Sequence, residues 1–473
     1  MNLFRFLLPL TLLVTSIGCT QVQPEPEAPK PPRPKLDKIA EWLKTVPGVS
    51  QVKELDPDDD YKKYFMLTFE QLIDPKNPSV GTFSQRVFLS HQDFDSPMVF
   101  DGQGYSAEDA LKSPSTCELT DRYKANRLEV EHRYAGESVP FGSDWKYLTL
   151  ENAAADMHAV RKALGVAYTG KWIATGASKS GTNAMSYAMH YPEDVAATVA
   201  YVCPVINGEA DPRFLDHLMT VGTPEMRKKI EDFQVQLLLR RDRLQQSLAV
   251  VDPTPGARET MTEEQEYESY VLTFAQAQWQ YALPTDIIPD DDATDKEILD
   301  YLRTRFNKKG ALSPVYGVTN QSGLSRKNGK PDYDNIHYNV QSLMEEGSPM
   351  YVITPRLLPL MPNHKSWTEN TIARFLVPAS AADLKYSDVW YNKMINWFKN
   401  SDPKLICVFG EYDYWTAAAP DRAYFEGKSN MAIYTKFLLK KLFSKHNLAN
   451  KAFTTWDVAI RLNPHSSLYF PAL

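Results

Sequence analysis

Short apolar runs recur through the first half of the chain. They are rich in β-branched and aromatic residues, which is typical of strands. The runs cover residues 85–92, 97–104, 127–134, 171–178 and 197–205.

Two helical patterns separate the last three of these runs. In 151–165, the residues Ala153, Met157, Val160 and Leu164 share one face of a helix, and a glycine ends the pattern. A second helix is predicted over 180–191. Alternation of strands and helices in this order predicts a parallel sheet with helices on its faces.

The pattern changes after about residue 212. Long polar, helix-rich stretches extend to about 310, and an irregular segment rich in Tyr, Asn and Pro extends to about 395. Strand-like runs return only at 404–413 and 430–435. We therefore predict an α/β fold in which a sheet domain is interrupted by a mostly helical insertion.

The predicted boundaries follow from these changes. The sheet domain is expected to comprise 37–207 and 400–473, and the helical cap 208–399. The chain shows no internal repeat.

The N-terminus resembles an export signal. Residues 1–18 contain one cation, an apolar stretch too short to span a bilayer comfortably, and then small residues before Cys19. "SIGC" resembles a bacterial lipoprotein cleavage site and predicts a lipid on Cys19, with plain secretion as the alternative. Six prolines in 19–36 predict an extended linker, or else a tail without a spacer role.

Composition excludes some classes of function. The chain has 473 residues, 43% of them hydrophobic, so it can bury a large core. A net charge of −7 without a basic cluster argues against nucleic-acid binding. Cys117, Cys203 and Cys407 do not form a disulfide framework, and the last two lie in apolar runs that predict burial. Neither metal-ligand spacing nor a dinucleotide fingerprint occurs, so no metal or cofactor is expected.

The most informative stretch is "KWIATGASKSGTNAMSYAMHYP", residues 171–192. A strand followed by Gly176, Ser178, small residues and a helix matches a nucleophile elbow, in which serine sits on a tight turn. Ser180 stands where the pattern has its second glycine, and Gly181 follows. A capping serine is the alternative, because serine is common at helix starts.

An elbow directs the backbone N–H of the residue after the serine, here Lys179, toward a developing oxyanion. A second N–H comes from a loop after an earlier strand. We expect it in "EHRYAGES", residues 131–138, from Tyr134 or Ala135. An ordinary polar turn is the alternative for this segment.

Several blocks together resemble the bacterial secreted tripeptidyl aminopeptidases, a family of serine peptidases distantly similar to the prolyl carboxypeptidases. They include "QRVFLSHQDFDSPMVFDGQGY", "VEHRYAGES", "DWKYLTLENAAADMHAVRKAL", "GASKSG" and "FGEYDYW", in order between about 60 and 435. The resemblance implies an α/β-hydrolase fold with a helical cap and release of short peptides from free N-termini. It also implies that Ser178 is the nucleophile and Asp413 the acid that orients a histidine. The family usually has Gly-Gly after Ser-Lys, where this chain has Ser180-Gly181.

The position of the histidine departs from the family. On this fold the triad runs in the order Ser, Asp, His, and only His446 and His465 follow Asp413. A Pro-Gly-Gly-Ser-His turn is expected near 441, but the chain continues "FLLKKLFSKHNLANKAF". Either the gene is frameshifted near codon 436, which makes 436–473 doubtful as part of the domain, or the tail is divergent and His446, with His465 as the alternative, is the base.

Three functions remain open at this point. The first is an exported serine aminopeptidase acting on peptide substrates, secreted or held at a membrane only through a lipid on Cys19. The second is an esterase on the same scaffold. The third is a catalytically impaired envelope lipoprotein that binds peptides. The sequence does not indicate the oligomeric state.

Overall fold

The computed structural model describes residues 33–140, 142, 144–249, 261–281, 287–306, 326–327, 330–331, 336–369, 372–375 and 377–436. The predicted signal peptide, Cys19, most of the linker, His446 and His465 lie outside these residues. The described residues belong to one unit, which begins at Arg33.

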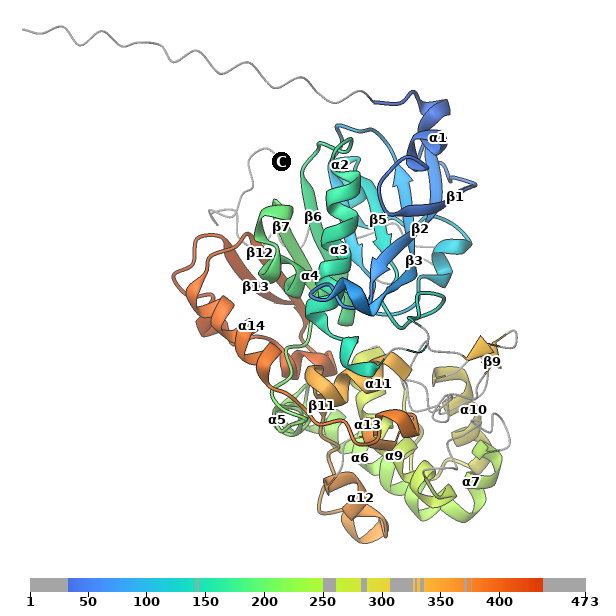
Figure 1. Cartoon of the computed structure of the whole chain (residues 1–473). Coiled ribbons are helices and arrows are strands. Elements are labelled where there is room, and N and C mark those ends of the chain that lie inside the picture. Colours follow the sequence, from blue (N-terminus) through green and yellow to red (C-terminus); the bar gives the residue numbers. More distant parts are fainter. Residues whose placement is uncertain are drawn as a thin grey trace, which may run out of the picture. The chain divides into compact units, whose positions relative to one another are not determined.

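A nine-stranded sheet forms the centre of this unit (Figure 1). Its spatial order is β1 (Val49–Leu55), β2 (Lys63–Leu72), β3 (Thr82–His91), β5 (Asn126–Val130), β4 (Met98–Gly102), β6 (Trp172–Ala177), β7 (Ala197–Tyr201), β12 (Leu405–Gly410) and β13 (Met431–Lys436). All strand pairs from β5 to β13 are parallel. Each predicted strand run therefore forms a strand.

The N-terminal part of the sheet differs from the prediction. β1, β2, β3 and β5 pair antiparallel, so the sheet is mixed. The pattern did not reveal β1 and β2. β1 is an edge strand without a buried residue, and so lacks the apolar run on which the strand prediction relied.

Helices cover both faces of the sheet. They are α1 (Ile39–Leu43), α2 (Glu118–Tyr123), α3 (Leu150–Leu164), α4 (Lys179–His190) and α14 (Val389–Asn400). Figure 1 shows α3 and α4 lying across the sheet, and the apolar face of α3 packs into the core cluster that contains Phe100 and Trp172. α3 begins at an N-cap, Thr149, whose side chain accepts a hydrogen bond from the N–H of Asn152, at 3.1 Å.

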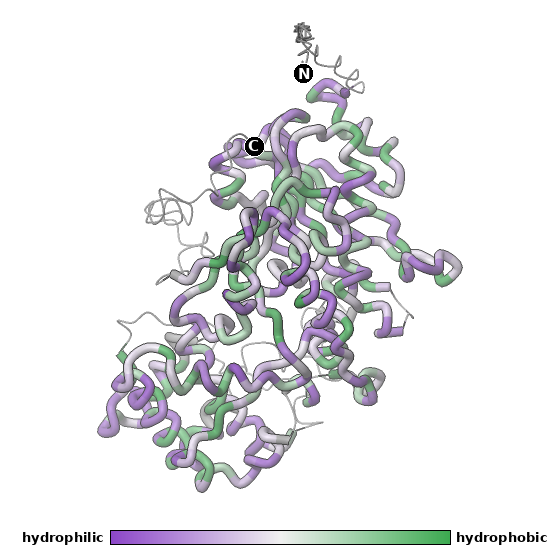
Figure 2. Tube along the Cα trace, turned by 90° about the vertical axis from the view of Figure 1, so that its left-hand side faces the viewer, coloured by the Kyte–Doolittle hydropathy of each residue, from purple (hydrophilic) through white to green (hydrophobic). Residues whose placement is uncertain are grey.

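α14 belongs to the sheet rather than to the cap. The sequence placed residues up to 399 in the cap, but Trp390, Met394 and Phe398 pack into the core cluster of β7 and β12. Cys203 and Cys407 are buried in the same cluster as free thiols, which confirms the prediction that they are packing residues. The hydrophobic residues in Figure 2 concentrate in this interior, whereas polar residues occupy many of the connecting segments.

The insertion is mostly helical, as predicted. It contains α5 (Arg213–Thr220), α6 (Pro224–Leu239), α7 (Arg241–Ala249), α9 (Glu263–Tyr281), α10 (Asp295–Phe306), α11 (Ile336–Gln341), α12 (His364–Glu369) and α13 (Ile372–Phe375), with two-residue strands β8 (Ala210–Asp211), β9 (Arg326–Lys327), β10 (Lys330–Pro331) and β11 (Ser348–Pro349). The larger helices share a core of their own around Phe233 and Trp367. β8 pairs with β11, which joins the first and later parts of the insertion. Within the described part of the chain, no helix has the length and apolarity to cross a membrane.

Candidate active site

Ser178 occupies a strained turn between β6 and α4. Its backbone has φ 57° and ψ −127°, a conformation that residues other than glycine rarely adopt. The Ser178 N–H donates to the carbonyl oxygen of Tyr201 at 2.8 Å, and the Ser178 carbonyl accepts from the N–H of Thr182 at 3.1 Å. Neighbouring strand and helix therefore both hold the turn, which is the geometry of a nucleophile elbow.

Two glycines make this turn possible. A Cβ on Gly176 would lie 2.4 Å from the carbonyl carbon of Ser180, and one on Gly181 would lie 3.1 Å from the carbonyl oxygen of Tyr201. Gly181 thus allows α4 to approach β7 closely, although it stands one position later than the pattern expects. Ser180 at the expected position is accommodated as a buried residue.

Asp413 lies at the same edge of the sheet as Ser178. The register aligns Ala177 of β6, Tyr201 of β7 and Val408 of β12. Ser178 directly follows Ala177, and Asp413 follows the end of β12 at Gly410. Parallel strands bring their carboxyl ends together, so the structure places both predicted residues where an active site on this type of sheet is built.

The Asp413 carboxyl is held in a largely desolvated position. Its Oδ1 accepts a hydrogen bond from the N–H of Trp415 at 2.8 Å. Burial raises the pKa of Asp413 to about 7, against the lowering effect of that hydrogen bond. A positive charge beside it, such as an imidazolium, would favour the ionised form.

Within the described residues, no histidine side chain is hydrogen-bonded to Ser178 or to the Asp413 carboxyl. His217 of α5 bonds instead to the backbone of Asp413, and burial lowers the pKa of His217. The two histidines that the sequence offered as bases lie outside the described residues, so that assignment stays a prediction.

Ser178 opens into a small cavity of about 20 Å³ between the sheet and the insertion. Aromatic residues form part of its wall, and Glu346 is the carboxylate among its lining residues. The lining residues are Ser178, Lys179, Thr182, Pro204, Ile206, Tyr338, Ser342, Glu346, Gly347, Trp390 and Trp415. Because Trp415 belongs to the segment that begins at Asp413, the two predicted triad residues contribute to one region.

The side chain of Lys179 is buried in an ion pair that sequence reasoning missed. Its Nζ donates to Glu346 Oε1 at 2.7 Å and to the side-chain oxygen of Gln341. Burial lowers the pKa of Lys179, while Glu346 acts in the opposite direction. The partners lie more than 160 positions away in the sequence, and no local pattern connects them to the elbow.

A second carboxyl lies beside this pair. Glu345 Oε1 accepts from the N–H of Leu150 at 2.5 Å and from Gln341 Nε2 at 3.1 Å. Burial, with the nearby charge of Glu346, raises the pKa of Glu345 to about 7, against the lowering effect of its hydrogen bonds and of Lys179. Of these two neighbouring carboxyls, that of Glu346 contacts the Lys179 ammonium.

The predicted second oxyanion donor needs correction. The N–H of Tyr134 donates to the carbonyl of Ser138 at 2.8 Å, and that of Ala135 to the carbonyl of His132 at 3.0 Å. Both groups are used within their own turn, and neither is available to an oxyanion. The segment approaching the elbow instead follows β4, the strand beside β6. A Cβ on Gly104 would lie 2.6 Å from Lys179 Cβ.

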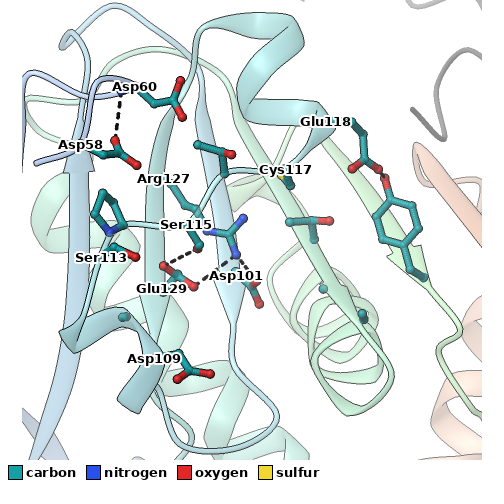
Figure 3. A pocket seen from close by; sticks show the side chains of 17 residues that line it. Asp58, Asp60, Asp101, Asp109, Ser113, Ser115, Cys117, Glu118, Arg127 and Glu129 are labelled. Carbon is teal, nitrogen blue, oxygen red and sulfur yellow. Dashed lines mark hydrogen bonds and ion pairs between the residues drawn. The ribbon is translucent and has the colours of Figure 1, made fainter. Parts of the chain in front are cut away.

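A larger cavity, of about 540 Å³, lies near the end of β6 (Figure 3). Its lining includes the buried ion pairs of Arg127 with Asp101, at 2.8 Å, and with Glu129, at 3.2 Å. Thr175, Gly176 and Ala177 line the same space. It is therefore separate from the cavity that Ser178 lines. In the described ranges, no group of three or more His, Cys, Asp or Glu side chains is arranged to hold a metal ion.

Comparison with known proteins agrees with this geometry. The family model described as PS-10 peptidase S37 matches residues 32–426, most of the chain. The chain belongs to the PS-10 peptidase S37 family. It is thus a serine-type peptidase, and its strand order and elbow are those of an α/β-hydrolase fold.

Curated relatives of this S37 chain are also peptidases. A prolyl tri/tetrapeptidyl aminopeptidase of Streptomyces mobaraensis is 29% identical over 422 residues, which cover 87% of this chain and 81% of that protein. Lysosomal Pro-X carboxypeptidase of Mus musculus is 29% identical over 161 residues, 30% of this chain and 33% of that protein.

Solved structures superpose on this chain only with low TM-scores. Proline iminopeptidase of Mycobacterium smegmatis matches 78% of this chain and 90% of its own at 9% identity, with a TM-score of 0.34. Epoxide hydrolase A of Mycobacterium thermoresistibile matches 78% and 92% at 11% identity, with a TM-score of 0.33. The fold assignment rests on the family and the strand order instead.

Proposed function

We propose that this S37 peptidase is an exported aminopeptidase that releases short peptides, tripeptides in the first place, from free N-termini. The observation that carries the proposal is the carboxylate of Glu346, which lines the same cavity as Ser178. The tri/tetrapeptidyl aminopeptidase activity named for the Streptomyces relative supports it.

The charges around the small cavity favour a substrate ammonium. Glu346 lines the cavity with Ser178, and Glu345 is its neighbour in the chain. Lys179 compensates one carboxylate. Above about pH 7, where Glu345 also ionises, one negative charge remains, and an α-ammonium group would pair with it.

In the proposed reaction the oxygen of Ser178 attacks the scissile carbonyl as its proton passes to a histidine base. The N–H of Lys179, as the first residue of α4, belongs to the amides that have no partner within the helix. It faces the developing oxyanion in the elbow geometry. The leaving amine takes the proton from the histidine, and water then hydrolyses the acyl-enzyme. Asp413 orients the histidine, for which His446, or else His465, remains our assignment.

Export and lipidation of Cys19 belong to the same proposal and rest on the sequence of residues 1–19. Cells expressing the full chain would be fed an alkyne-labelled fatty acid, and the purified protein would be tested for label. We expect label on the natural chain and none on Cys19→Ala. If the natural chain appears in the culture medium without the fatty-acid label, it is secreted without a lipid.

The test of the peptidase activity compares substrates with and without a free amine. The full chain should hydrolyse tripeptide amides with a free N-terminus and leave their N-acetylated forms intact. Ser178→Ala should abolish both hydrolysis and covalent labelling by a fluorophosphonate. Turnover of short acyl esters alone would indicate an esterase, and peptide binding without turnover a catalytically impaired binding protein.

The role of the acidic groups is tested by Glu346→Gln. We expect the KM for free-amine tripeptides to rise about tenfold, because one ion pair with the substrate is worth on the order of 1.4 kcal/mol at this depth of burial. Glu193→Gln, an exposed position near the far end of α4, is the matched control for loss of one negative charge. An unchanged KM for Glu346→Gln would show that the ammonium binds elsewhere.

A further inference from the structure

The loop that follows β4, residues 102–105 and here called the β4 loop, passes between the nucleophile elbow and the insertion. It runs so close to the elbow that a Cβ on Gly104 would lie 2.8 Å from the backbone nitrogen of Ser180. Only glycine fits this approach. Gly104 therefore lies directly against the first two residues of α4, which follow Ser178.

The elbow helix holds the β4 loop from one side. Ser180 Oγ accepts a hydrogen bond from the N–H of Gly104 at 2.8 Å. One turn further along α4, Asn183 Nδ2 donates to the carbonyl oxygen of Gln103 at 2.9 Å. Both contacts come from the helix whose first residue carries the oxyanion N–H.

The insertion contacts the same residue, Gly104, from the other side. His337 of α11 is fully buried, and its Nε2 donates to the carbonyl oxygen of Gly104 at 3.0 Å. α11 also carries Gln341, which binds the side chain of Lys179. One helix of the insertion therefore contacts both the elbow and the β4 loop.

A buried ion pair lies near Ser180 at the end of β4. The carboxyl of Asp101, at the end of β4, pairs with Arg127 at 2.8 Å. Burial raises the pKa of Asp101 to about 7, and the nearby Arg127 and Ser180 act in the opposite direction. Figure 3 shows Asp101 and Arg127 joined in this cluster. The Ser180 oxygen, which accepts from the N–H of Gly104, therefore lies close to a buried charged pair.

We propose that Ser180 and His337 are positioning residues that fix the backbone N–H and the carbonyl of Gly104 and so hold the β4 loop beside the elbow. Acyl transfer needs its oxyanion site held to within about 0.5 Å, and the second donor in an elbow comes from the loop after the neighbouring strand. The catalytic consequence rests on the proposed function.

Ser180→Ala tests the contact without depending on activity. Alanine keeps the Cβ and removes only the hydroxyl that Gly104 uses. Hydrogen exchange measured by mass spectrometry on peptides covering 102–108 should be about three- to tenfold faster, the range expected for loss of one hydrogen bond. Ser186→Ala is the matched control, because Ser186 is a buried serine of the same helix that does not contact the β4 loop. Unchanged exchange in Ser180→Ala, or an equal increase in Ser186→Ala, would overturn the proposal.

Substitutions of His337 provide the second test. His337→Gln keeps a side-chain N–H for the Gly104 carbonyl and should stay near the natural exchange rate, whereas His337→Leu should exchange faster. On a free-amine tripeptide amide, Ser180→Ala and His337→Leu should lower kcat about tenfold with KM unchanged. If the natural chain is active and both variants keep its kcat, the positioning role is refuted. If the parent hydrolyses no peptide, the proposed function fails, and the exchange comparison alone decides this inference.

Discussion

Arg133 provides the sharpest test of how the sheet domain is held together. The residue is fully buried, and all five of its donor hydrogens are used. Two parallel bonds, of 2.8 and 2.7 Å, reach the carboxylate of Asp156 on α3. The others reach backbone carbonyls of Leu72, Ile73 and Tyr147 at 2.9 to 3.2 Å. One guanidinium thus ties together three loops and a helix.

The perturbation is Arg133→Met, which keeps much of the volume and removes every donor. Breaking a buried ion pair from one side costs about 3–5 kcal/mol, because the remaining charge loses its partner. Three carbonyls, one of them in a fully buried contact, also lose a hydrogen bond, at about 1 kcal/mol each. We therefore expect a loss of about 6–8 kcal/mol in the free energy of unfolding. That equals a third or more of the roughly 5–15 kcal/mol typical of a domain.

The assay is urea unfolding followed by circular dichroism, with Asp156→Leu and the double variant Arg133→Met/Asp156→Leu measured in parallel. The double variant contains no orphaned charge, so it should be more stable than Arg133→Met by about 2 kcal/mol. A loss below about 1 kcal/mol for Arg133→Met, or strict additivity in the double variant, would refute the argument.

Three further predictions follow from the site. Gly181→Ala should destabilise the elbow and slow fluorophosphonate labelling at least tenfold, since its Cβ would lie 3.0 and 3.1 Å from two backbone carbonyl oxygens; normal labelling would contradict the close packing. Because burial raises the pKa of Glu345 to about 7, the native state binds its proton more tightly than the unfolded chain, whose carboxyl titrates near 4.3 by rough estimate. The Glu345 carboxyl therefore contributes stability below pH ~4, and this contribution is lost as the pH rises through ~7. Glu345→Gln should flatten the fall in the free energy of unfolding between these pH values. An unchanged dependence of that free energy on pH would mean that the pKa of Glu345 is ordinary. Replacing the residues after Lys436 by a Pro-Gly-Gly-Ser-His turn and a closing helix should raise tripeptide hydrolysis about 10²–10⁴-fold, the usual contribution of a general base. The contrary result is a natural chain that is already active and that His446→Ala or His465→Ala inactivates. That histidine would then be the base.

Much of the sheet could be predicted from local patterns. The buried strands from β3 onward are continuous apolar runs, since both faces of each strand are covered by protein. The edge strand β1 has no buried residue and carried no comparable pattern. Ser178 was identified because an elbow needs a strand, small residues and a helix within about ten neighbouring positions.

The contacts around Ser178 required the tertiary structure. Lys179 was predicted only for its backbone N–H, but its side chain pairs with Glu346, far along the chain. The predicted donors Tyr134 and Ala135 were wrong because hydrogen bonds within their turn use both N–H groups. A turn sequence indicates that a loop exists, but not which atoms its own bonds will use.

The sequence by itself determined the parts of this protein that depend on neighbouring residues: the strands from β3 onward, the elbow, the helical insertion and the family. The tertiary structure decided which loop lies against the elbow, which charges gather beside the nucleophile, and that α14 packs on the sheet. Periodicity and turn chemistry act over a few residues, whereas strand order and burial bring together groups such as Ser180, Gly104 and His337 that no sequence pattern connects.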